Sequence, residues 1–276
     1  MRSADSQPVP FAPWEIASIE ERRQAAVITD LGAESRPWAG GVAAFGGVGS
    51  WINQAINAGS QGEVSPEDVE EVASWFAVRG AEPKVVLTPY SHPSLRASLA
   101  AAGFVLKTLE TLLVCDLHEL APAPPKLPEG MTLQTVDPTD DQAVEIYARF
   151  ATGIHFGEGA ADVLTASFRA AVRHPRSSAL ILRDAGTVVA VCGFEHFENL
   201  GALWGGAVAP SHRRRGLQRL LIEHRLHALR ERGLRWATIA SQPTIGTERN
   251  AIRAGMRPAY ARLEMVRPGE GLVPSP

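Results

Sequence analysis

The sequence predicts an α/β protein made of two copies of one unit, and two observations lead to this fold class. Short apolar runs typical of strands alternate with amphipathic runs typical of helices, in the same order in both halves of the 276-residue chain. Glycines also recur at a nearly constant spacing: an offset of 152 pairs Gly49 with Gly201 and Gly103 with Gly255, and an offset of 153 pairs Gly80 with Gly233. Self-similarity at a fixed offset indicates an internal repeat.

The elements of each copy follow from hydrophobic periodicity and from β-branched content. In the first copy we expect strands at residues 50–59, 84–90 and 104–117, and helices at residues 65–80 and 94–103. In the second copy we expect strands at residues 187–195, 201–210, 234–241 and 258–266, and helices at residues 216–233 and 246–255.

A proline-rich segment separates the two copies. The run "LAPAPPKLPEG", residues 120–130, holds four prolines and no hydrophobic periodicity, which is typical of a semi-rigid linker. We therefore expect one domain at residues 1–120, a linker at residues 121–130 and a second domain at residues 131–276.

The composition is that of an ordinary globular protein. Hydrophobic residues make up 45% and charged residues 21%, and the net charge is -3, so the chain has no general basic surface for nucleic acid. Cys115 and Cys192 lie in strand-like runs without metal-ligand spacing, which predicts buried, reduced thiols, no metal and a cytoplasmic location. The first 15 residues lack an apolar signal core, and residues 37–62 are too polar to span a bilayer, so we expect no membrane partner.

The matching helices of the two copies differ at their starts. Residues 65–68, Ser-Pro-Glu-Asp, supply an N-cap hydroxyl, a first-turn proline and acids that suit the helix dipole. Residues 213–216, Arg-Arg-Arg-Gly, precede the second helix with charges of the wrong sign for that dipole. A bound phosphate or pyrophosphate would resolve this conflict, because helix-start N–H groups and arginine forks both bind anions.

A turn of arginines that point into water is the alternative interpretation. The preceding strand favours a ligand, because Gly205 and Gly206 lie in its middle, where glycine is typical of a bulge or of a close approach by another group. The pattern is neither the dinucleotide fingerprint nor a Walker A loop, since no Lys-Ser/Thr follows Gly216.

The segment "VAPSHRRRGLQ" resembles the phosphate-binding loop of the GNAT superfamily of acyl-CoA-dependent N-acyltransferases, with Arg213 in the first position and Gly216 as the central glycine. Gln218 departs from the small residue usual at the end of that loop, although its amide can still donate to phosphate. The segment "ERNAIRAGM" is similar to the family's helix before a Gly-Phe turn, with Asn250 where the cofactor is commonly touched. The resemblance covers roughly residues 130 to 268.

The resemblance implies a mixed, mostly antiparallel central sheet flanked by helices (an α/β fold of the layered α+β kind), present in two copies, the first of which has lost its phosphate loop. It also implies acetyl-CoA as the co-substrate. The cofactor-binding residues would be Ala207 and Val208, on the strand that pairs with the pantetheine arm, and Arg213, Arg214, Arg215, Gly216, Leu217, Gln218 and Asn250 around the pyrophosphate.

The family's usual acid, a tyrosine four residues before the turn glycine, is replaced here by Ala251. Tyr260 lies on the expected last strand and is better explained as a packed aromatic. His224 falls on the apolar face of its helix and is expected to be a satisfied core histidine.

Glu195 is the candidate general base, because it ends an apolar strand and could take a proton through water; a solvated strand-end carboxylate is an equally good explanation. His155 and His196 are weaker candidates, since neither has an identifiable partner in the sequence.

Taken together, these features predict an N-acetyltransferase that moves an acetyl group from acetyl-CoA to a primary amine of a small molecule or peptide, by direct attack in a ternary complex. Two alternatives stay open: a non-catalytic acyl-CoA sensor, which the missing tyrosine favours, and an acyltransferase with a different donor or acceptor. The sequence does not specify the acceptor or the oligomeric state.

Overall fold

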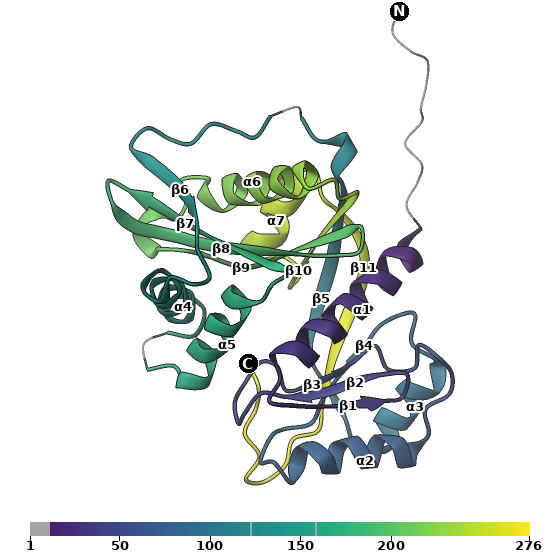
Figure 1. Cartoon of the computed structure of the whole chain (residues 1–276). Coiled ribbons are helices and arrows are strands. Elements are labelled where there is room, and N and C mark those ends of the chain that lie inside the picture. The colour runs from purple at the N-terminus through teal and green to yellow at the C-terminus, as the bar shows by residue number, and fades with distance from the viewer. Residues whose placement is uncertain (1–11, 122, 158) are drawn as a thin grey trace, which may run out of the picture.

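The computed structural model describes residues 12–121, 123–157 and 159–276, which form one continuous sheet flanked by helices (Figure 1). Residues 1–11, which the sequence predicts to lack a signal core, lie outside the described residues, as do Pro122 of the expected linker and Glu158. The strands are β1 (Glu34–Trp38), β2 (Gly41–Phe45), β3 (Gln54–Ile56), β4 (Lys84–Leu87), β5 (Val105–Asp116), β6 (Met131–Thr135), β7 (Ser177–Asp184), β8 (Thr187–Phe197), β9 (Leu200–Val208), β10 (Trp236–Ser241) and β11 (Arg257–Val266). The helices are α1 (Pro13–Leu31), α2 (Pro66–Ala77), α3 (Pro93–Ala101), α4 (Asp141–Phe156), α5 (Asp162–Arg173), α6 (Leu217–Glu231) and α7 (Gly246–Arg253).

The strand order in the sheet is β1-β2-β3-β4-β11-β5-β10-β9-β8-β7-β6. Two neighbouring pairs are parallel, β3 with β4 and β9 with β10, and the other pairs in the described chain are antiparallel. This topology confirms the mixed, mostly antiparallel sheet.

The two copies exchange their last strands. β5 follows β4 in the chain but lies between β10 and β11, while β11, from the C-terminal end, lies between β5 and β4. Both copies then have the same five-strand order, β1-β2-β3-β4-β11 and β7-β8-β9-β10-β5, which confirms the internal repeat. The domain boundary at residues 121–130 stays a prediction, and strands from both sides of it share this sheet.

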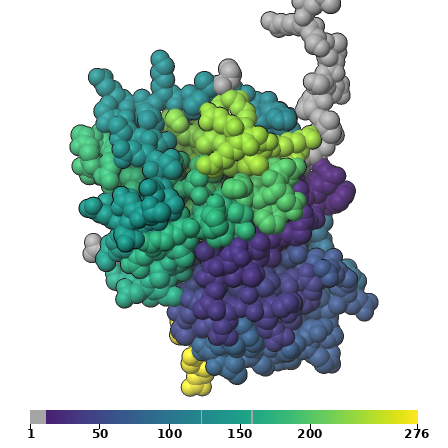
Figure 2. All heavy atoms as spheres, viewed as in Figure 1, coloured from purple at the N-terminus to yellow at the C-terminus, as the bar shows by residue number. Residues whose placement is uncertain are grey.

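The helices pack on both faces of the sheet (Figure 1). Apolar side chains of α6 and α7 form one core with strands β5, β7, β8 and β10, and α4 and α5 cover the opposite face of β7, β8 and β9. In the N-terminal copy α2 and α3 pack against β2, β3 and β4. The space-filling view in Figure 2 shows α1, in purple, at the boundary between the two copies.

Helix α1 was not predicted, because its buried face is not purely apolar. Glu20, Glu21 and Arg23 are all less than 10% exposed, beside the buried Ile16 and Ala17. Charged residues at these positions break the apolar periodicity that identifies a helix in a sequence.

Most predicted elements are present with ends that differ by a few residues, but the strand expected at residues 50–59 is reduced to β3. The preceding residues form turns held by the buried Asn53, whose side chain accepts from the Gly46 amide and donates to the Gly47 carbonyl. An asparagine that bonds to nearby backbone competes with strand pairing.

Both cysteines are buried and free, as the sequence predicts. Among the described residues, no helix is both long and apolar enough to cross a bilayer, and no cluster of three or more His, Cys, Asp or Glu side chains could hold a metal ion.

Candidate functional site

Strands β9 and β10 separate partway along their length. They pair only from Leu200 to Ala202 on β9, opposite Trp236 to Thr238 on β10. Beyond that point β9 continues to Val208 while bonded to β8 alone within the described chain. Its β10-facing edge therefore leaves backbone groups for an extended ligand to pair with.

A bulge lies in the middle of β9, where the sequence predicts one. The register with β8 shifts between Val191 and Gly193, and Gly205 has φ +60°, a conformation that favours glycine. A Cβ at Gly205 would lie 2.7 Å from the buried hydroxyl of Tyr147 on α4. His155, also on α4, bonds to the backbone of Gly205; burial lowers the pKa of this imidazole, and the bond only partly opposes that shift. The bulge is thus packed closely from the α4 side.

The loop after β9 leads into a helix start without a side-chain cap. Gly216 is the N-cap residue of α6, with φ +78°, and a Cβ there would meet no atom within 4 Å. There is thus open space beside Gly216, and no side chain caps the first amides of α6. By contrast, α2 begins with a complete capping box between Ser65 and Asp68, as the sequence predicts.

The three arginines before Gly216 are exposed, but they are not equivalent. Arg213 donates to the Val208 carbonyl at 3.4 Å, and Arg215 lies 3.5 Å from Asp184. Arg214 has φ +62° and no hydrogen-bond or ion-pair partner in the part of the chain that the structure describes. Arg214 is therefore the arginine most available to a bound anion.

The other expected cofactor residues lie beside this helix start. Leu217 is buried under α6, so it can offer only its backbone. Gln218 donates to Thr247 at 2.8 Å and accepts from Asn250 at 2.7 Å, which links the first turn of α6 to α7. The structure thus brings together the expected loop residues and Asn250. The side chains of Gln218 and Asn250 are hydrogen-bonded to each other.

A cavity of about 380 Å³ lies at the inner end of the β9–β10 separation, between the two copies. Its lining includes Trp204 and Gly205 of β9 and Thr238 of β10, and it extends to Trp51 and Lys84 of the N-terminal copy. Pockets of this size and mixed lining are typical of small-molecule sites.

Glu195 lines this cavity and is only 4% exposed, so it is not the solvated strand-end carboxylate of the alternative interpretation. Arg23 of α1 forms an ion pair with its Oε1. Burial disfavours the charge of Arg23, but Glu20 and Glu195 outweigh burial and raise the pKa of this guanidinium above its usual value. Glu195 Oε2 has no hydrogen-bond partner among the described residues, and this oxygen could accept a proton.

The ion pair of Arg23 and Glu195 continues into a buried network. Glu20 bonds to Arg23 at 2.6 Å and to Arg262 of β11 at 3.1 Å, and Arg262 also bonds to Glu21 at 2.8 Å. Tyr260 donates to Glu21 at 2.7 Å, so Tyr260 is the packed strand aromatic that the sequence predicts. Sequence reasoning missed Glu20, Arg23 and Arg262, because α1 and β11 are far apart in the chain.

The remaining candidates take varied positions. Ala251 is fully buried against the core under α6 and α7, and His196 is exposed. The prediction for His224 holds only in part: the residue is partly buried rather than in the core, and its Nε2 makes no hydrogen bond within the described residues, although a bond to the Pro125 backbone opposes the lowering of the imidazole pKa by burial. The neighbouring Arg225 takes the core position instead. Arg225 is 2% exposed and donates to the carbonyls of Gly193 and Trp204, at the bulge.

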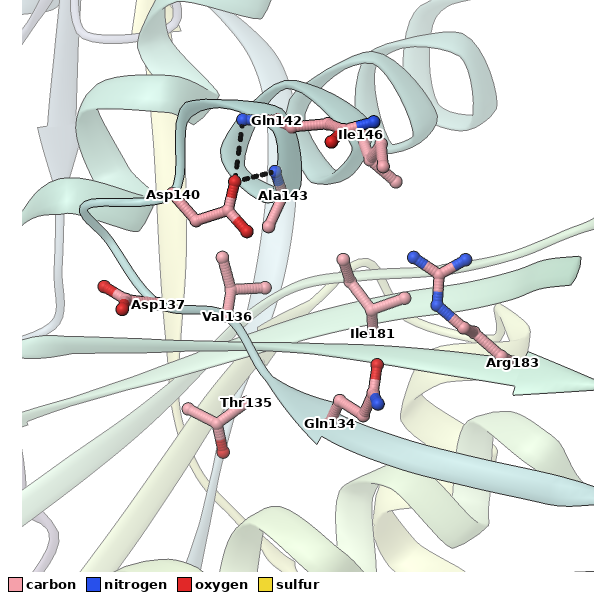
Figure 3. A pocket seen from close by; sticks show the side chains of 10 residues that line it. All are labelled: Gln134, Thr135, Val136, Asp137, Asp140, Gln142, Ala143, Ile146, Ile181 and Arg183. Carbon is pink, nitrogen blue, oxygen red and sulfur yellow. Dashed lines mark hydrogen bonds between the residues drawn. The ribbon is translucent and has the colours of Figure 1, made fainter. Parts of the chain in front are cut away.

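A second cleft, of about 630 Å³, opens at the sheet edge between β6, β7 and the start of α4 (Figure 3). Its Asp140 carboxylate caps α4 by accepting from the amides of Gln142 and Ala143, and Arg183 donates to the Gly186 carbonyl. The charged side chains of this cleft are hydrogen-bonded to nearby backbone, and none of the expected site residues lies in the cleft.

Part of the chain matches a known protein family. Residues 141–246 match the model of the acetyltransferase (GNAT) family. None of the curated protein sequences matches the chain.

Among solved structures, the chain is similar over 96% of its length to 98% of a GCN5-related N-acetyltransferase from Kribbella flavida, with a TM-score of 0.70 and 19% identity. A tandem GNAT protein from the clavulanic acid biosynthesis pathway matches over 95% of this chain and 99% of its own, with a TM-score of 0.60 and 15% identity. An acetyltransferase of the GNAT family from Novosphingobium aromaticivorans matches over 96% and 100%, with a TM-score of 0.56 and 16% identity. At these identities the structural likeness concerns the fold.

Proposed function

We propose that the protein transfers an acetyl group from acetyl-CoA to a primary amine, because residues 141–246 match the acetyltransferase (GNAT) family model and the whole chain shares its fold with a tandem GNAT protein. The observation that carries this proposal is the separation of β9 from β10. It leads from an uncapped helix start at one end to a cavity with a buried carboxylate at the other.

The residues at the outer end fit the phosphates of acetyl-CoA. The uncapped amides of α6 and the open space at Gly216 suit a pyrophosphate, and Arg214 can add a charge-assisted bond. Ala207 and Val208 offer strand backbone to the pantetheine arm. When bound, acetyl-CoA supplies an acetyl group activated as a thioester.

The residues at the inner end suit proton transfer. An ammonium has no lone pair, so the acceptor must lose a proton before its nitrogen attacks the thioester carbonyl carbon. In this proposal Glu195 accepts that proton, directly or through one water, while Arg23 holds the carboxylate in place. The C–N bond forms as the C–S bond breaks, and the sulfur leaves as a thiolate. A backbone N–H of the freed β9 edge would stabilise the oxyanion.

A non-catalytic acyl-CoA sensor is the second candidate. It is favoured by Ala251, which stands in the place of the family's acid and is enclosed in the core. An acyl donor other than acetyl-CoA also fits the same loop.

Thiol release tests both candidates. The full chain is incubated with acetyl-CoA and a panel of primary amines, while calorimetry measures acetyl-CoA binding. A transferase releases thiol with at least one amine, and Glu195→Gln lowers that rate by about 100-fold or more. Tight binding without thiol release on any amine supports the sensor, and absent binding contradicts both.

A further inference from the structure

The charges around the inner cavity are not balanced. Four carboxylates line it, Glu20, Glu110, Glu195 and Glu264, against three basic side chains, Arg23, Lys84 and Arg262. His155 and His174 also line it: burial lowers the pKa of the His155 imidazole, which favours its neutral form, and His174 lies 3.2 Å from the Asp30 carboxylate.

Each basic side chain already has a carboxylate. Arg23 pairs with Glu20 and Glu195, and Arg262 pairs with Glu20 and Glu21. Lys84 lies 3.8 Å from Glu264 and donates to the Pro276 carbonyl. No basic group is therefore left to receive an acidic ligand, such as the carboxylate of an amino acid.

Glu110 is the carboxylate without a partner. Its cross-strand neighbour is Arg262, but that guanidinium is directed to Glu20 and Glu21, and no other bond reaches Glu110 from the described residues. Burial raises the pKa of Glu110, with Arg262 opposing in part, as expected for a desolvated carboxylate that lacks its own cation. A cationic ligand would relieve this cost.

The second free acceptor is Oε2 of Glu195, at the other side of the cavity. Glu195 lies opposite Ala202, Ala202 opposite Thr238, and Thr238 opposite Val114, four residues from Glu110 along β5. Three strand spacings and four residues of rise place the two Cα atoms on the order of 20 Å apart. A cavity of about 380 Å³ that extends over this distance must be narrow. A ligand that reaches both carboxylates must therefore be elongated.

We propose that the amine acceptor is a linear polyamine, whose reacting nitrogen lies at Glu195 and whose distal ammonium binds Glu110. Of these two contacts, only the one at Glu195 rests on the proposed acetyl transfer. Trp204, Phe156 and Phe168 also line the cavity and provide aromatic faces for the methylene segments and for cations. The distal ammonium keeps its protons throughout and takes no part in the bond changes.

The test compares spermidine with hexylamine, lysine and glucosamine as acceptors for the full chain. We expect spermidine to be acetylated with the lowest KM. Glu110→Gln should raise the KM for spermidine about 10-fold or more with little change in kcat, because one charge-assisted bond is lost, and it should leave hexylamine unaffected. Glu70→Gln, which changes an exposed carboxylate on α2 outside the cavity, is the matched control.

Calorimetry with spermidine alone separates this inference from the proposed function. Binding that Glu110→Gln weakens supports the polyamine site even without turnover. Equal spermidine affinity in wild type and Glu110→Gln overturns it, and so does efficient acetylation of glucosamine or lysine in preference to spermidine, although acetyl transfer itself then stands. Melting temperature checks that Glu110→Gln is folded.

Discussion

Replacing Gly216 by aspartate places a carboxylate where the pyrophosphate is proposed to lie. A helix start usually gains about 0.3–1 kcal/mol from an acid, but Gly216 has φ +78°, where a residue with a Cβ costs about 1–2 kcal/mol. The net effect is a decrease of about 1 kcal/mol in the free energy of unfolding, which lowers the melting temperature by about 2–4 °C for a chain of this size. The positive φ thus reverses the sign expected for an acid at this position.

Gly216→Asp should change the affinity for acetyl-CoA more than it changes stability, because the new carboxylate repels the phosphates. Two unit charges 4 Å apart repel by about 4 kcal/mol at an effective dielectric constant of 20, and exposure of Gly216 reduces this by screening. We expect at least a 10-fold loss of affinity for Gly216→Asp by calorimetry, larger at low salt.

Gly216→Asn is the control, because asparagine has the shape of aspartate without its charge. It should melt close to Gly216→Asp but keep most of the affinity. If both variants bind acetyl-CoA as tightly as wild type, the helix start of α6 does not hold the phosphates, and the assignment of the loop is refuted.

Three further predictions concern separate features. Arg214→Ala should weaken acetyl-CoA binding more than Arg215→Ala, since Arg215 already shares Asp184, and both losses should shrink as salt rises in a calorimetric titration; equal affinity at all salt concentrations would contradict this. Ala251→Tyr should lower the melting temperature, because overpacking a filled core costs about 1–3 kcal/mol, and an unchanged melting temperature would mean that the core there is open. Burial raises the pKa of Cys115 to about 12, so the thiol stays protonated and unreactive toward a disulfide reagent at pH 8 until the protein unfolds; rapid reaction of the native protein would show that Cys115 is accessible.

The sequence predicts the parts of this molecule that depend on local pattern. The helix starts at Ser65 and at Gly216 and the bulge at Gly205 follow from residues near one another in the chain, and the repeat follows from the same order of local patterns in both halves. The sequence also suggests Glu195 as a base. Whether this carboxylate is solvated or buried depends on its partner Arg23, which is 172 residues away in the chain.

What the sequence could not predict depends on contacts between distant elements. Arg23, Glu110 and Arg262 line one cavity because α1, β5 and β11 meet at the middle of the sheet. No local pattern marks a buried ion pair, since each charged residue alone is typical of an exposed surface. The core position expected for His224 goes to Arg225 for a related reason, because a long arginine can occupy the core when backbone carbonyls accept its hydrogen bonds.

The exchange of β5 and β11 also constrains how the chain folds. The N-terminal copy has all of its helices by residue 101, yet β4 has no neighbour on its outer side until β11 arrives with residues 257–266. During synthesis that edge stays open while more than half of the protein is made, and an open strand edge favours aggregation. Closing it pairs residues that are about 180 positions apart, such as Lys84 and Val266, and contacts over so long a separation slow folding. Removal of the last strand should therefore damage the copy that is first in the sequence as severely as the one that is last.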